Sequence, residues 1–172
     1  MRTTPVPGPR GVLEVDWAFF GELCRALALK VAREYDPEVV LGIAKAGVIP
    51  GVVVASILQR EFASMVVTRR DAGAEPVLVA GPPFTIQGRR VLIVDETCDT
   101  GSTMKLALSE VRALKPKSVK TAVSFRTGAY QPDYYAFETS NFIILPWDRE
   151  VISNGELILR PEYAARLAEQ AD

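Results

Sequence analysis

One segment of the sequence joins a run of aliphatic residues to acids, hydroxyls and a glycine, and these residue types suit the binding of a sugar phosphate. Val91–Val94 is followed by Asp95 and Glu96, and then by a turn, Asp99–Thr103, that contains Gly101. The backbone N–H groups of such a turn, where it opens a helix, bind a phosphate, and the glycine lets the ligand approach the backbone closely. The adjacent carboxylates repel a phosphate. We therefore expect them to face sugar hydroxyls or Mg²⁺ on the same ligand.

The aliphatic run, the acid pair and the turn together resemble the phosphoribosyl diphosphate (PRPP) motif of type I phosphoribosyltransferases, over about fourteen contiguous positions. The resemblance implies that Asp95 and Glu96 hold the ribose hydroxyls, directly or through Mg²⁺, and that the turn binds the 5′-phosphate. The implied PRPP contacts in this motif are Asp95, Glu96, Thr97, Cys98, Asp99, Thr100, Gly101, Ser102 and Thr103. The alternative is a buried strand before an N-capped helix, which explains Asp99 or Ser102 but leaves the acid pair unexplained.

A second candidate anion loop follows the apolar run Val39–Ile43. Small residues, a lysine and a glycine at the end of a strand suit an anion loop at the sheet edge where α/β folds bind ligands. The segment resembles the diphosphate loop of the same family, although Ala46 replaces a commoner glycine. The resemblance implies PRPP contacts from Lys45, Ala46 and Gly47, and a non-proline cis peptide near Lys45–Ala46. The alternative is a plain turn with a solvated lysine.

Proton transfer in this chain has to be carried out without histidine, because the sequence contains none. Acids, Lys, Arg and Tyr remain as candidate general acids or bases. The family resemblance implies that Asp99 is the catalytic residue, which accepts the N7 proton of a purine or holds it by a hydrogen bond. Adenine and orotate members typically lack an aspartate at this position, so Asp99 favours a 6-oxopurine substrate.

The block from residue 126 to residue 148 resembles the purine members of the family, particularly the short bacterial and archaeal 6-oxopurine enzymes. The resemblance implies that Arg126 replaces the usual lysine as donor to the 6-oxo group, and that Phe142 stacks on the base. Ile143 is implied as a backbone partner of the base edge. Ile144 stands where some members hold a glutamate that recognises the 2-substituent of the base. The absence of this glutamate favours hypoxanthine or xanthine over guanine. Asp148 is implied as a second metal contact.

Each of these residues also has a simpler interpretation. The planar guanidinium of an arginine is not equivalent to the ammonium of a lysine. Arg126 therefore need not contact the 6-oxo group in the way that the usual lysine does. Taken singly, Phe142 and Trp147 are better explained by packing in a core than by contact with a ligand.

The segment from Arg69 to Gly88 has little periodic pattern beyond a short strand at Val77–Ala80. Twenty residues with so little order inside a compact domain are usually functional or disordered. In the family this interval holds a flexible flap that closes over the reaction centre and excludes water. We therefore expect Arg69 and Arg70 to reach the diphosphate. The alternative is a solvated basic turn.

The elements that must position these residues alternate along the chain. Apolar periodicity and turn signals predict helices at 17–35, 52–58, 104–114 and 163–171, and strands at 39–43, 63–68, 91–94 and 119–125. Strands that alternate with helices predict an α/β fold, a doubly wound parallel sheet of the phosphoribosyltransferase type with a small hood lobe and a flap. We expect a single domain of 172 residues, with an N-terminal arm at 1–12, a core at about 13–126 and a base-binding hood at 127–172.

Composition narrows the function further. The net charge is −1 and no basic block is present, so the sequence gives no reason to expect a nucleic-acid partner. We find no apolar run of about eighteen residues and no signal-peptide pattern, and we expect a soluble, cytoplasmic protein that does not bind membranes. The two cysteines are too few for a disulfide framework or a zinc site.

The sequence as a whole predicts an Mg²⁺-dependent enzyme that transfers the phosphoribosyl group of PRPP to a nucleobase, as a homodimer or homotetramer. A 6-oxopurine such as hypoxanthine or xanthine is the expected base. Two alternatives stay open from the residues alone. One is a regulator that binds PRPP without turnover, and the other is a transferase for a different base such as orotate or uracil.

Overall fold

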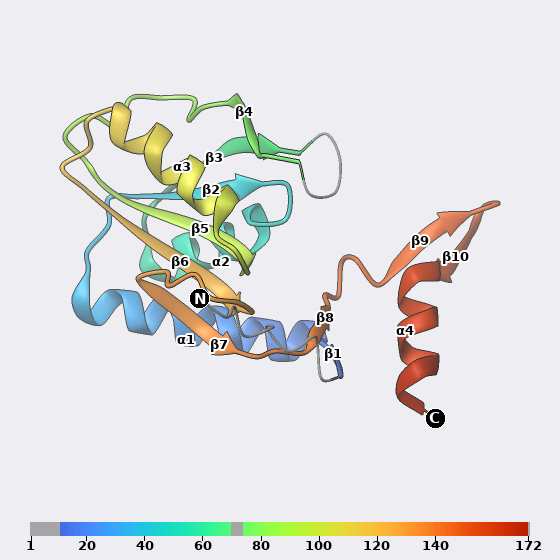
Figure 1. Ribbon diagram of the computed structural model, residues 1–172. Helices are drawn as coiled ribbons and strands as arrows, with labels where there is room; N and C mark the ends of the chain where they lie inside the picture. Colours follow the sequence, from blue (N-terminus) through green and yellow to red (C-terminus); the bar gives the residue numbers. More distant parts are fainter. Residues whose placement is uncertain (1–10, 70–73, 172) are drawn as a thin grey trace, which may run out of the picture. The chain divides into compact units, whose positions relative to one another are not determined.

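The computed structural model describes residues 11–69 and 74–171 (Figure 1). The chain forms two compact units. The core unit runs from Glu22 to Glu138, and the terminal unit combines the N-terminal residues up to Gly21 with those from Thr139 onward. The boundary between the units lies between residues 138 and 139, and the base-binding hood from residue 127 stays a prediction. No helix within the described ranges has the length and apolar character needed to cross a membrane.

The core unit is built on one six-stranded sheet with the strand order β4-β3-β2-β5-β6-β7. The strands are β2 (Val39–Ala44), β3 (Glu61–Thr68), β4 (Val77–Ala80), β5 (Arg90–Cys98), β6 (Ser118–Arg126) and β7 (Tyr134–Glu138). All neighbouring pairs are parallel except β3 and β4, which are antiparallel. The predicted doubly wound parallel sheet is therefore confirmed, with one antiparallel strand added at its edge.

Helices cover both faces of this sheet (Figure 1). Leu41 and Ile93 pack in one cluster with residues of α3 (Ser102–Ala113), whereas Leu92 packs in a second cluster with residues of α1 (Trp17–Glu34) and α2 (Val48–Leu58). Successive side chains of a strand point to opposite faces, so a strand covered on both sides must be apolar at every position. This requirement explains the run Val91–Val94, which is fully buried.

Two helix starts illustrate how local signals act. The first helix, α1, begins at residue 17 as predicted, and Asp16 caps it, since its Oδ1 accepts the N–H of Phe19 at 2.7 Å. The second helix, α2, begins at Val48, four residues before the predicted start at residue 52. The predicted start is wrong because a proline is a common turn signal, whereas Pro50 is the third residue of α2. A proline in the first helical turn is tolerated, because its missing N–H would have no partner there.

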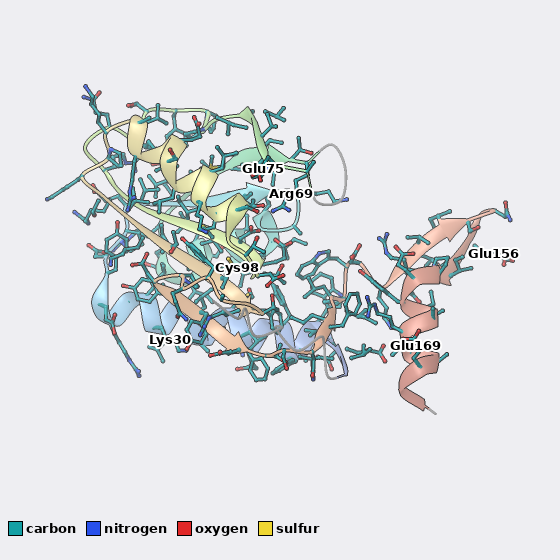
Figure 2. The ribbon with its side chains drawn as sticks, in the orientation of Figure 1. Lys30, Arg69, Glu75, Cys98, Glu156 and Glu169 are labelled. Carbon is teal, nitrogen blue, oxygen red and sulfur yellow. The ribbon has the colours of Figure 1, made fainter. Side chains whose placement is uncertain are left out.

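The topology brings the two predicted PRPP segments together. Strands β2 and β5 are neighbours, but the chain continues from β2 to β3 on one side and from β5 to β6 on the other. In open α/β sheets, ligands bind outside the carboxyl ends of the strands at such a switch point. Strands β3 and β5 both end at this carboxyl edge of the sheet. Figure 2 labels Arg69, which follows β3, and Cys98, the last residue of β5.

The terminal unit contains two small sheets and a helix. Strands β1 (Val12–Glu14) and β8 (Phe142–Ile144) are parallel, and β9 (Glu150–Ser153) forms an antiparallel hairpin with β10 (Glu156–Leu159) before α4 (Pro161–Ala171). Asn154 and Gly155 have φ of 51° and 84°. Left-handed backbone at both central residues is the requirement of a type I′ hairpin turn, which an Asn-Gly pair meets.

Asp133 fastens β7 to β6 within the core unit. Its carboxylate accepts from Lys120 Nζ at 2.8 Å and from the N–H and hydroxyl of Thr121 at 2.8 and 2.9 Å. Burial by itself raises the pKa of Asp133, but the hydrogen bonds from Lys120 and Thr121 outweigh it and lower the pKa below the usual value. Asp133 thus has a structural role, because it connects the start of β7 to β6.

We expect Asp133→Asn to lower the free energy of unfolding at neutral pH by about 1–3 kcal/mol, since it removes charge-assisted hydrogen bonds. A lowered pKa in the folded state means that the ionised carboxylate stabilises the fold at neutral pH, and that this contribution is lost as the pH falls through the folded-state pKa. Urea unfolding at pH 7 and at about pH 2.5 checks both points. The difference between Asp133→Asn and the wild type should shrink at the lower pH. As a control, Asp36→Asn, which removes an exposed ion pair with Arg60, should lower the free energy of unfolding by less. If the difference in unfolding free energy between Asp133→Asn and the wild type were the same at both pH values, the ionised carboxylate of Asp133 would not be its cause.

Candidate active site

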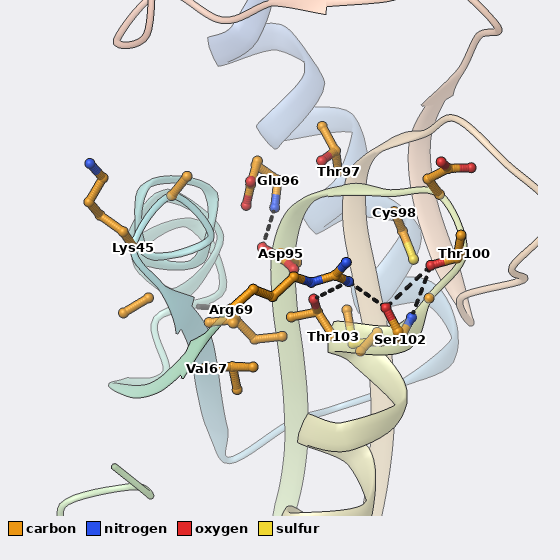
Figure 3. A pocket seen from close by; sticks show the side chains of 16 residues that line it. Lys45, Val67, Arg69, Asp95, Glu96, Thr97, Cys98, Thr100, Ser102 and Thr103 are labelled. Atoms are coloured by element: carbon orange, nitrogen blue, oxygen red, sulfur yellow. Dashed lines mark hydrogen bonds between the residues drawn. The ribbon is translucent and has the colours of Figure 1, made fainter. Parts of the chain in front are cut away.

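A cavity of about 350 Å³ lies at the carboxyl ends of β2 and β5, entirely within the core unit (Figure 3). Except for Gly47, every residue predicted to bind PRPP lines it, and Arg69 lines it as well. The predicted acid pair and the predicted phosphate turn therefore face one space. This was the central expectation from the sequence. The individual contacts with PRPP stay predictions.

The acid pair stands between the two loops. Asp95 is only 8% exposed, and its Oδ1 accepts the N–H of Glu96 at 3.0 Å. Burial raises the pKa of Asp95 well above its usual value, and the neighbouring Glu96 raises it further. Gly47 stands against Asp95, because a Cβ at this position would lie 2.6 Å from Asp95 Oδ1. Gly47 therefore makes room for the buried acid.

The cis peptide of the first loop lies one bond before its predicted place. The structure has it between Ala44 and Lys45, where the sequence predicted Lys45–Ala46. Lys45 is exposed, and its side chain extends away from the acid pair in Figure 3.

The predicted phosphate turn has the geometry of an anion site. Gly101 has φ of +77° and precedes the first residue of α3, and the N–H of that residue, Ser102, donates to Thr100 Oγ1 at 3.4 Å. The first N–H groups of a helix have no intrahelical partner and carry the positive end of the helix dipole. Thr100 Oγ1 and Ser102 Oγ lie 3.3 Å apart, so hydroxyls surround these N–H groups. A phosphate is the kind of ligand that such a turn can bind.

A segment after β6 holds this turn in place, and the sequence interpretation missed it. The N–H groups of Thr127 and Tyr130 donate to the carbonyls of Cys98 and Asp99, at 2.9 and 3.2 Å. A Cβ on Gly128 would lie 1.9 Å from Asp99 Oδ1. The signal that could have found these residues is their position after β6, which ends beside β5.

Cys98 contributes a packed thiol to the cavity wall. It is 5% exposed, and burial followed by the nearby charges of Asp95 and Asp99 raises its pKa to about 12. A thiol in this state is neutral and a poor nucleophile. Its place in the motif therefore fits packing beside the acids.

Arg126, the predicted donor to the base, is already engaged by the protein. Its Nε donates to the carbonyl of Tyr130 at 3.1 Å, its Nη1 lies 3.1 Å from Glu138 Oε2, and its guanidinium lies over the ring of Tyr135. The side chain is 14% exposed. Contact with a base requires these partners to rearrange, so this assignment stays a prediction.

The remaining predicted base contacts lie in the terminal unit. The ring of Phe142 contacts the ring of Tyr163, with centroids 5.6 Å apart, and the guanidinium of Arg166 lies 4.3 Å from its centroid. Ile143 is half-buried, whereas Ile144 is fully buried and its carbonyl accepts the N–H of Val15 at 2.9 Å. The burial of Ile144 favours packing over contact between its side chain and a base.

Asp95 and Glu96 are candidate ligands for Mg²⁺ at the cavity. The described residues contain no group of three or more His, Cys, Asp or Glu side chains suited to a metal. Mg²⁺ usually binds one or two carboxylates, several waters and oxygens of the substrate, so Asp95 and Glu96 form a sufficient donor set. Asp148, the other predicted metal contact, accepts instead from Arg160 and from the hydroxyl of Tyr163. Arg70 lies outside the described residues.

Comparison with known proteins agrees with this geometry. A sequence model of the phosphoribosyl transferase domain matches residues 16–156. The crystal structure of a purine phosphoribosyltransferase from Pyrococcus horikoshii is 32% identical and superimposes with a TM-score of 0.74, covering 84% of this chain and 99% of that one. The hypoxanthine phosphoribosyltransferase of Trypanosoma cruzi, complexed with IMP, is 18% identical with a TM-score of 0.68, covering 90% and 87%. The second likeness is one of fold.

Curated relatives match over shorter stretches. The hypoxanthine-guanine phosphoribosyltransferase of Pan troglodytes is 44% identical over 74 residues, which are 40% of this chain and 34% of that protein. The human phosphoribosyltransferase domain-containing protein 1 is 36% identical over 66 residues, 36% of this chain and 29% of that protein. These matches span about a third of the length of the relatives.

Proposed function

The chain belongs to the phosphoribosyltransferase family, and from that membership we propose that it transfers the 5-phosphoribosyl group of PRPP to a 6-oxopurine such as hypoxanthine or xanthine. The products are a nucleoside 5′-monophosphate and diphosphate. The observation that carries the proposal is that the acid pair, Asp99 and the phosphate turn line the same cavity. The purine phosphoribosyltransferase of Pyrococcus horikoshii, which aligns over 99% of its length, supports the choice of a purine.

The residues of the cavity divide the substrate among them. Asp95 and Glu96 hold the ribose hydroxyls, and the turn Thr100–Thr103 binds the 5′-phosphate. As the bond from C1 to the diphosphate breaks, positive charge develops on the ribose ring, and the carboxylates stabilise it. Lys45 offsets negative charge on the departing diphosphate. Fixing the phosphate and the ribose together aligns C1 with the attacking base, which lowers the entropic part of the barrier.

Asp99 acts on the base. A ring nitrogen of the purine attacks C1 while the proton at N7 moves to the Asp99 carboxylate or is held by it. Asp99 is exposed on the cavity wall, and the N–H of Tyr130 holds its carbonyl at 3.2 Å, so its backbone is fixed while its carboxylate is accessible. Asp95 and Glu96 are the residues that would hold Mg²⁺ with oxygens of PRPP, and the ion would supply charge neutralisation at the leaving diphosphate.

The direct test is an assay of the purified chain with PRPP and Mg²⁺ against hypoxanthine, xanthine, guanine, adenine, uracil and orotate. We expect a monophosphate product with hypoxanthine or xanthine. Product with only orotate or uracil would overturn the choice of a purine. If no base gives a product but calorimetry shows that PRPP binds, the proposal of an enzyme fails, and the chain is instead a regulator that binds PRPP without turnover.

A further inference from the structure

Arg69 contacts the phosphate turn from outside it. The residue follows β3, and its Nη2 donates to Ser102 Oγ and, at 3.2 Å, to Thr103 Oγ1. In Figure 3 the guanidinium points toward these two hydroxyls, away from Lys45 of the diphosphate loop. The contact joins residues more than thirty positions apart in the sequence.

The positive charge of Arg69 is available to a ligand. None of the ion pairs among the described residues includes this arginine, whereas Arg60 and Arg89 of the same unit each pair with a carboxylate. A guanidinium has five N–H donors, and the two contacts with hydroxyls use only part of them. Because Arg69 also lines the cavity, its remaining donors are placed near any anion bound there.

A phosphate bound at the turn requires positive charge, which Arg69 can supply. No basic residue lies within Asp99–Thr103, and the ammonium of Lys105, two residues further on, donates to the carbonyl of Thr100 at 3.4 Å. A hydroxyl can accept one hydrogen bond and donate another, so Ser102 and Thr103 can accept from Arg69 while they donate to a phosphate oxygen. A planar guanidinium suits phosphate oxygens and adds a charge-assisted bond.

We propose that Arg69 binds the 5′-phosphate of the substrate, at the N-terminus of α3, and does not bind the diphosphate. The inference rests on the proposed function for the identity of the ligand, and it changes the role that the sequence suggested for this residue. It makes Arg69 a cationic part of the phosphate site, supplied from the residue after β3 to the turn between β5 and α3.

Two fragments of the substrate separate the possibilities. Ribose 5-phosphate carries the 5′-phosphate without the diphosphate, and inorganic diphosphate carries only the leaving group. Calorimetric titration with Mg²⁺ present is done on the wild type, Arg69→Met, Arg69→Lys and Arg60→Met. Arg60 is the matched control, because it precedes β3 and lies at the opposite end of the same strand.

We expect Arg69→Met to weaken ribose 5-phosphate and PRPP by a similar factor, roughly tenfold, with diphosphate binding unchanged. Arg69→Lys should recover part of the affinity, and Arg60→Met should bind like the wild type. Weakened diphosphate with unchanged ribose 5-phosphate would overturn the inference, as would unchanged binding of both or a wild type that does not bind ribose 5-phosphate. If no base gives product but ribose 5-phosphate binding depends on Arg69, the inference stands while the proposed transfer fails.

Discussion

Replacing Asp99 by asparagine is expected to lower turnover with hypoxanthine by about 10²–10⁴-fold, while the affinity for PRPP stays within about threefold. Asparagine keeps the size of the side chain and part of its hydrogen-bonding capacity, but it cannot take up a proton from the purine. The Asp99 carboxylate lies against Gly128, which has no side chain there, and the amide of an asparagine fits in the same space. The measurements are kcat and KM with saturating PRPP, and the Kd of PRPP by calorimetry.

The control for this prediction is Asp36→Asn, the same exchange of atoms at the amino end of the sheet, where Asp36 pairs with Arg60 and Arg90. It should leave both kcat and PRPP affinity unchanged. If Asp99→Asn weakened PRPP as much as it slowed turnover, Asp99 would be a residue that binds PRPP in the ground state. Unchanged turnover would exclude it as the catalytic residue.

Buried strands and capped helices were predictable because their signals are local. Val91–Val94 is apolar at every position, a pattern that only a strand covered on both faces requires, and Asp16 precedes a helix with apolar periodicity. The hairpin around Asn154 and Gly155 was missed, although an Asn-Gly pair is a strong local signal for such a turn. Its flanking strands read Glu-Val-Ile-Ser and Glu-Leu-Ile-Leu, so they lack the alternation of polar and apolar residue types that marks a half-buried strand.

The site was predictable only in part, since contacts between distant segments leave little local trace. The acid pair and the turn are contiguous, and one sequence pattern includes both. By contrast, Tyr130 packs on Gly101 from the segment between β6 and β7, and Arg69 donates to Ser102 from the residue after β3. Nothing in the sequence near Arg69 indicates whether its partner is a hydroxyl, a carboxylate or solvent. That choice follows from the strand order, which places the ends of β3 and β5 on either side of β2.

Gly101 is the residue of the turn whose substitution should be most damaging to binding. Its φ of +77° costs an alanine about 1–2 kcal/mol. A Cβ there would also lie 2.3 Å from Cγ and Cδ2 of Tyr130, so the ring or the turn has to move. A displacement of about 1 Å in a binding site can lower activity by ~100-fold. We therefore expect Gly101→Ala to weaken PRPP by about that factor, measured by calorimetry, together with a fall in the free energy of unfolding.

Gly88 provides a matched control for the backbone strain. It has φ of +71°, but a Cβ on it would meet nothing within 4 Å. Gly88→Ala should therefore lose stability by a similar strain while it binds PRPP like the wild type. If Gly101→Ala behaved in the same way, the close approach of Tyr130 would have no part in the phosphate site. A double-mutant cycle with Tyr130→Ala tests the contact itself, because removing the ring relieves the clash but not the strain. Partial recovery of PRPP affinity in the double variant, relative to Gly101→Ala, would locate the damage in the displaced turn.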